Sequence, residues 1–144
     1  MLSETLPLLH PAAAKSLVLA AGCIHFCIVV ANLFAPAKLR YREELGPVTP
    51  IIRQIFFVHS AYIVLVLVGF TLLCFFFPDE LTGRTRLGHA LCGFLAFFWM
   101  LRGFLQTFYY DTRIKRANRG FNVLFTTAFF SLGLIFTTLT RFGS

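Results

Sequence analysis

Four long apolar stretches, separated by short polar segments, fill almost the whole chain and constrain its fold more than any other feature. They occupy residues 16–37, 54–78, 87–110 and 120–140. Arg102 is the only charged residue within them. An α-helix rises about 1.5 Å per residue, so each stretch is long enough to cross a hydrocarbon core of about 30 Å. The chain is therefore predicted to fold in a lipid bilayer.

The composition of the chain also agrees with folding in a lipid bilayer. The 144 residues are 58% hydrophobic and only 13% charged, which excludes an ordinary soluble domain. A soluble helical bundle would need polar outer faces at helical period, and the stretches lack them. Short connections favour antiparallel neighbours. We predict a single all-α domain over residues 1–144, an antiparallel bundle of four transmembrane helices at about 15–35, 52–77, 86–110 and 121–140.

The net charge of +7 arises from basic residues that flank the stretches. Loops one and three together carry eight of them: Lys38, Arg40, Arg42, Arg53, Arg113, Lys115, Arg116 and Arg119. The opposite side carries four: Lys15, Arg84, Arg86 and Arg141. The positive-inside rule then places loops one and three in the cytoplasm and both termini outside, and we expect a bacterial inner membrane. This distribution indicates membrane topology and attraction to anionic lipid headgroups rather than binding of nucleic acid.

Prolines and cysteines add detail to the layout. Pro36 is predicted to end the first helix, and Pro50 suits the first turn of the second. A short amphipathic helix is predicted at residues 39–45. The four cysteines all lie inside predicted spans, where they act as small apolar fillers. Cys23, His25 and Cys27 do not form a metal site, because alternate residues of a helix point to opposite sides.

Arg102 is the strongest candidate for a functional residue. A charge inside a span costs several kcal/mol unless it is paired, hydrated or close enough to reach the headgroups. It lies roughly 12 Å inside the end of the third span, so snorkelling of its side chain is the structural alternative. At 100° per residue, Trp99, Gln106 and Tyr109 share its face within about 80°. Such a polar stripe is expected to face the bundle or a partner rather than lipid.

Each of the other helices contributes a polar residue at a similar depth. These residues are Asn32 on the first helix, His59 with Tyr62 beside it on the second, and Asn122 on the fourth. Convergent polar groups at one depth are typical of a ligand pocket in a bundle. A layer of interhelical hydrogen bonds that only fixes the packing is the equal alternative. The predicted ligand-binding residues are Asn32, His59, Tyr62, Trp99, Arg102, Gln106 and Tyr109.

Two cofactors could use such a layer, haem b or a quinone. A haem needs axial ligands, and His25 and His59 are the only deep pair of histidines. Their depths differ by roughly 9 Å, so both could reach one iron only if the helices tilt or bend. A quinone requires less: one His or Tyr donor, one Arg or Gln donor, and apolar walls.

In size and layout the chain also resembles the family of membrane-associated glutathione and eicosanoid enzymes. Arg102 followed by Tyr109 is similar to that family's Arg and Tyr on one helix. The resemblance implies a small self-assembling membrane enzyme. The second span departs from the family, because RQIFFVHSAYIVLV lacks its Asn and Glu. Glutathione binding is therefore not implied, and no catalytic residue is carried over.

The spans contain no carboxylate for coupling to protons or cations, which disfavours a pump or a cation channel. We expect an accessory or anchor subunit of a membrane electron-transfer complex, with a quinone-like ligand or haem in the cytoplasmic half. The alternatives are a homo-oligomeric enzyme acting on a lipophilic substrate and a purely structural subunit. The expected partners are the lipid bilayer, together with other membrane subunits or further copies of the chain.

Overall fold

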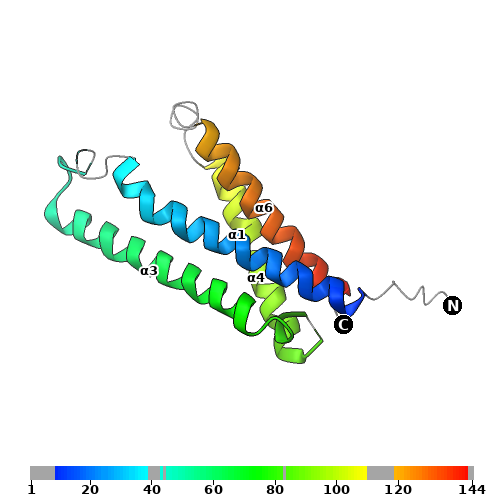
Figure 1. Cartoon of the computed structure of the whole chain (residues 1–144). Helices are drawn as coiled ribbons and strands as arrows, with labels where there is room; N and C mark the ends of the chain where they lie inside the picture. The colour runs from blue at the N-terminus through cyan, green and yellow to red at the C-terminus, as the bar shows by residue number, and fades with distance from the viewer. Residues whose placement is uncertain (1–8, 39–42, 44, 83, 110–118, 143–144) are drawn as a thin grey trace.

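Four long helices make up most of the molecule. The structure, a computed structural model, describes residues 9–38, 43, 45–82, 84–109 and 119–142. The helices are α1 (Pro11–Lys38), α3 (Pro50–Phe76), α4 (Arg86–Phe108) and α6 (Arg119–Phe142), with a short 3-10 turn, η1 (Glu80–Thr82), between α3 and α4 (Figure 1). Each long helix is apolar enough and long enough to cross a membrane. The prediction of an all-helical chain with four helices of membrane-spanning length is confirmed.

The helix ends depart from the predicted limits by a few residues. The prediction that Pro36 ends the first helix is wrong, because α1 contains Pro36 and continues to Lys38. Proline removes one backbone N–H and crowds the carbonyl four residues earlier. Since α1 ends within one turn of Pro36, this cost falls only on its last turn. Pro50 does begin α3, as predicted, whereas most of the predicted helix at 39–45 lies outside the described residues.

The helices associate as two pairs, α1 with α3 and α4 with α6 (Figure 1). Glycine permits close approach within the first pair: a Cβ on Gly22 would lie 3.0 Å from the Cβ of Cys74. Small residues at helix contacts are characteristic of membrane bundles, because packing rather than the hydrophobic effect holds the helices together. The buried core runs between the two pairs and includes Val18, Leu95 and Phe136.

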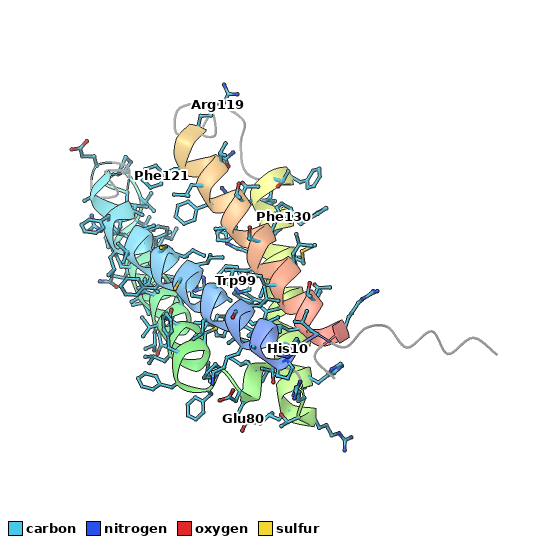
Figure 2. The ribbon with its side chains drawn as sticks, turned by 45° about the vertical axis from the view of Figure 1, so that its right-hand side comes forward. His10, Glu80, Trp99, Arg119, Phe121 and Phe130 are labelled. Carbon is cyan, nitrogen blue, oxygen red and sulfur yellow. The ribbon has the colours of Figure 1, made fainter. Side chains whose placement is uncertain are left out.

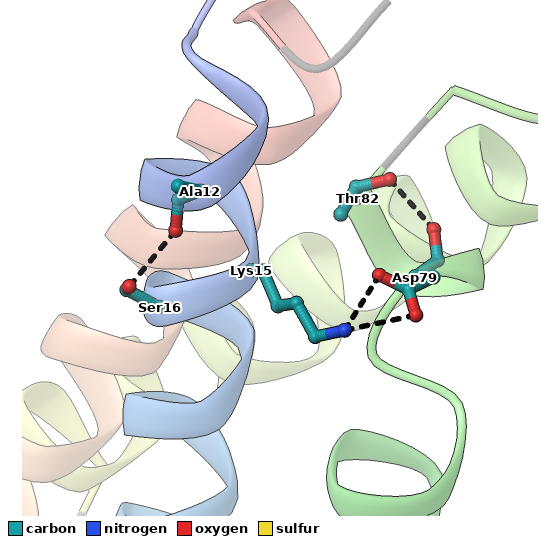
Figure 3. Close-up of polar contacts among 5 residues, drawn as sticks. All are labelled: Ala12, Lys15, Ser16, Asp79 and Thr82. Atoms are coloured by element: carbon teal, nitrogen blue, oxygen red, sulfur yellow. Dashed lines mark hydrogen bonds and ion pairs between the residues drawn. The ribbon is translucent and has the colours of Figure 1, made fainter.

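The short turn η1 contacts both α1 and α4 at one end of the bundle. We call this the closed end; α1 and α4 begin there, and α3 and α6 finish there (Figure 1). Lys15 at the start of α1 forms a salt bridge of 3.0 Å with Asp79, just after α3 (Figure 3). The Cys92 thiol on α4 donates a hydrogen bond of 3.1 Å to the Leu81 carbonyl in η1. The opposite end, where α1 and α4 finish and α3 and α6 begin, is called the open end.

Most hydroxyl side chains in the spans bond to their own helix. Each donates to the backbone carbonyl four residues earlier, at 2.7 to 2.9 Å. The residues concerned are Ser16, Ser60, Thr71, Thr107, Thr137, Thr138 and Thr140. In a bilayer no water would satisfy these donors, so the intrahelical bonds allow the hydroxyls to lie at membrane depth.

Candidate ligand-binding groove

Two adjoining hollows lie between the helix pairs, in the half of the bundle nearest the open end. Their volumes are about 600 Å³ and about 440 Å³, within the range of small-molecule sites. The two hollows share five of their lining residues and therefore form one groove. The shared residues are Asn32, Ala35, His59, Ile63 and Arg102. The groove thus draws its shared lining from α1, α3 and α4.

On the α4/α6 side, the polar residues form a connected chain. Arg102 donates through Nη1 to the Gln106 side-chain oxygen at 3.4 Å. Gln106 in turn donates through Nε2 to the Asn122 side-chain oxygen at 3.0 Å. The Arg102 guanidinium also lies 4.9 Å from the centre of the Phe129 ring, a cation–π distance. These contacts hold the cation in place with neutral groups and link α4 to α6.

On the α1/α3 side, the polar residues are less constrained. Asn32 donates to the Ile28 carbonyl of its own helix at 2.8 Å. Among the residues that the structure describes, the His59 ring makes no hydrogen bond, although it lines both hollows. Tyr62 lines the second hollow with 63% of its side chain exposed. This wall therefore offers an imidazole and a phenol with no bond to the rest of the described fold.

The inner end of the groove rests on an aromatic cluster around His25 and Trp99, each at most 1% exposed. Trp99 lies centrally, between the helix pairs (Figure 2). Its Nε1 donates to His25 Nε2 at 3.0 Å. Because an indole can only donate, Nε2 is the acceptor and the imidazole proton lies on Nδ1, 2.8 Å from the Ala21 carbonyl. Trp99 also stacks on Phe129 at 5.4 Å, beneath Arg102.

This geometry does not fit a haem held by His25 and His59. A haem ligand must offer a nitrogen lone pair to the iron. In His25 that lone pair, on Nε2, accepts the Trp99 hydrogen bond, and the other nitrogen donates to Ala21. His25 does not line the groove, whereas His59 does. Among the described residues, there is also no cluster of three or more His, Cys, Asp or Glu that could hold a metal ion.

The structure brings all the predicted ligand-binding residues to the groove. Asn32, His59 and Arg102 line both hollows, Tyr109 lines the first, and Tyr62, Trp99 and Gln106 line the second. Tyr109 lies at the rim with 81% exposure. Asn122, predicted for the same layer, stands behind Gln106 as its hydrogen-bond acceptor.

Sequence reasoning missed two contacts that shape the groove. The His25–Trp99 hydrogen bond joins α1 to α4 across 74 positions of the chain, and no local pattern indicates it. The partner ring of Arg102 is Phe129, one of 19 phenylalanines. The spacing of Phe129 on α6 places it on the same helix face as Phe125 and Asn122. That spacing does not indicate which residue of α4 the ring contacts.

Comparison of the chain with protein-family models, with curated proteins and with solved structures finds no match. The groove and its chemistry are therefore the basis for assigning a function.

Proposed function

We propose that the chain is an accessory or anchor subunit of a membrane electron-transfer complex, and that its groove binds a quinone-like ligand. The observation that carries this proposal is the groove, in which polar residues from both helix pairs meet between apolar walls. Its residues combine imidazole, guanidinium, amide and phenol groups in the half of the bundle nearest the open end. A purely structural layer would be expected to join these groups to one another, yet His59 lines the groove without such a bond among the described residues.

The rim of the groove favours a ligand that arrives from the bilayer. Ile63 and Val66 on α3 are each 43% exposed, and Leu105 on α4 is 40% exposed. The inner lining is closed, because Ile28 and Phe129 are each only 4% exposed. Apolar side chains thus border the opening between α3 and α4. A ligand with an apolar tail can leave that tail in the lipid while its head lies between the helix pairs.

The polar lining favours a head that accepts hydrogen bonds. Arg102, Gln106, His59 and Tyr62 all carry N–H or O–H donors, and quinone carbonyl oxygens are acceptors of suitable size. When bound, a quinone supplies the electron-carrying chemistry, while the chain binds and orients it. Since binding alone moves no electrons, the proposal requires partner subunits that carry the redox centres.

The proposed topology follows from the charges that flank the spans. In the sequence, loops one and three, which follow the ends of α1 and α4 at the open end, carry eight Lys and Arg residues, and the other flanks carry four. On the positive-inside rule, the helices alternate in direction, the open end faces the cytoplasm and both termini lie outside. The groove then lies in the cytoplasmic half of the membrane, and a bacterial inner membrane is the proposed location.

The test uses Trp99, the only tryptophan in the chain, which lines the second hollow. The protein, reconstituted in lipid nanodiscs, is titrated with a decyl-substituted para-benzoquinone while indole emission is recorded. We expect saturable quenching. Arg102→Leu should weaken binding by about tenfold or more, because hydrogen bonds to charged groups contribute about 1.5–3 kcal/mol. Arg141→Leu, on the exposed last turn of α6, is the matched control and should bind as the wild type does.

Two outcomes would count against the proposal. Quenching that rises linearly with quinone concentration in every variant would indicate partitioning into lipid rather than a site. Isolation from the native membrane should also yield other chains bound to this one. A homo-oligomer that purifies alone and converts a lipophilic substrate would instead establish the enzyme alternative.

A further inference from the structure

The hydrogen-bonding groups of the groove lie on two walls that belong to different helix pairs. His59 and Tyr62 come from α3, and Arg102 and Gln106 come from α4. His59 lies nine residues into α3 from Pro50, and Arg102 lies six residues before the end of α4 at Phe108. At 1.5 Å per residue, these positions are roughly 14 Å and 9 Å from the open end. Donors on both walls are therefore available at a similar depth.

The α4 wall is held by a chain of side-chain contacts. Arg102 is fixed by Gln106 at 3.4 Å and by the Phe129 ring at 4.9 Å. Gln106 is itself fixed by Asn122 at 3.0 Å. A guanidinium presents its N–H groups in a planar fork that can serve more than one acceptor. A ligand oxygen in the groove would therefore meet a donor whose direction is already set, which lowers the entropy cost of binding.

The α3 wall is the one that requires an acceptor. The His59 ring lines both hollows and makes no hydrogen bond within the described residues. The lining that both hollows share with it includes the apolar Ile63 and Ala35, together with Asn32, whose amide donates to the Ile28 carbonyl of its own helix. An apolar chain in the groove would leave the imidazole N–H without an acceptor, which costs free energy in a medium of low polarity. A ligand head with a single oxygen, bonded to Arg102, would likewise leave the His59 N–H without an acceptor.

We infer that the ligand of this groove carries two hydrogen-bond acceptors on opposite sides of one ring, as a para-quinone does. One carbonyl oxygen bonds to Arg102 on α4 and the other bonds to the His59 N–H on α3. The inference rests on the proposed function and narrows it from a quinone-like ligand to a para-quinone whose two carbonyl oxygens bridge the two helix pairs. The bridge lies in the half of the bundle nearest the open end.

The test compares two ligands that share a tail and differ in the number of oxygens. Decyl-para-benzoquinone, which has two, is bound to the nanodisc-embedded protein and followed through Trp99 emission. Decylcyclohexanone, which has one, is the competitor. We expect the ketone to bind about tenfold more weakly or worse, as the loss of one hydrogen bond implies.

Substitutions of His59 test whether the difference in affinity between quinone and ketone arises from the α3 wall. His59→Phe should lower quinone affinity by about tenfold and leave ketone affinity within about twofold, because the ketone oxygen still reaches Arg102. His59→Gln retains an N–H donor and should restore most of the lost quinone affinity. His89→Phe is the matched control, since His89 is exposed on α4 and does not line the groove.

Each outcome separates this inference from the function on which it rests. Equal affinities for quinone and ketone, or equal losses of both in His59→Phe, would overturn the bridging head while leaving a lipophilic ligand site in place. Absence of saturable quinone binding to the wild type would overturn both. Selective loss of quinone affinity in His59→Phe with recovery in His59→Gln is the expected result.

Discussion

Replacement of His25 by Phe tests whether the His25–Trp99 hydrogen bond stabilises the contact between the helix pairs. The substitution keeps an aromatic ring near Phe70 and Phe136, whose centres lie 5.8 Å and 6.0 Å from that of the imidazole. It removes the acceptor of the Trp99 N–H, which is bonded at 3.0 Å in a site with at most 1% exposure. A buried donor without an acceptor costs about 1–3 kcal/mol.

The magnitude of the bond itself comes from a double-mutant cycle. Trp99→Phe leaves the His25 Nε2 acceptor unpaired and also loses packing against Phe129. In the double variant, neither unpaired group remains, so the double variant should be less destabilised than the sum of the two singles. We expect a coupling between about 0.6 kcal/mol, the mean for hydrogen bonds between membrane helices, and about 1.7 kcal/mol, the maximum.

The assay is unfolding in mixed micelles with increasing dodecyl sulfate, followed by helical circular dichroism, because Trp99 is absent from two of the variants. His89→Phe, an exposed histidine on the same helix as Trp99, is the control and should unfold as the wild type does. If the two single losses add to the double loss within about 0.3 kcal/mol, the bond contributes no coupling. The His25–Trp99 pair would then be a packing contact only.

Two further predictions concern the closed end. Lys15→Ala removes a salt bridge whose side chains are 45% and 76% exposed, so the free energy of unfolding should fall by less than about 1 kcal/mol. A larger loss in the same dodecyl sulfate titration would show that the salt bridge contributes more to stability. Gly88→Ala should cost more, about 1–3 kcal/mol, because its new methyl group would collide with the Glu80 carbonyl of η1. Gly69→Ala is the matched control, since a Cβ at Gly69 would meet no atom within 4 Å; equal losses in the two variants would show that η1 is not packed on α4 as described.

Much of the fold was predictable because the bilayer leaves few choices. Charge-free stretches of sufficient length specify helices, and the flanking basic residues mark where they end. The predicted end of the first helix at Pro36 is wrong, because the helix continues for two more residues to Lys38. Proline is expensive in a helix interior but tolerable in its last turn, and the sequence alone does not say which applies.

The composition of the groove was also predictable in part. Counting residues from the span ends placed His59, Arg102 and Asn32 at a shared depth, and helical periodicity placed Gln106 on the face of Arg102. The structure brings these residues to one groove; that they bind a ligand stays a prediction. The pairing of helices was not predictable, because it depends on contacts such as those of Gly22 with Cys74 that lie far apart in the chain.

The bonds of hydroxyl groups to their own helices have a consequence for how the chain enters the membrane. During synthesis, Ser60 and Thr71 can leave the translocation machinery with their donors already satisfied, so α3 is competent to insert before any later helix exists. The ring of His25 is different, because its Nε2 acquires a donor only when Trp99, on the third long helix, has been made. The first helix therefore becomes fully hydrogen-bonded only after the third long helix has been made.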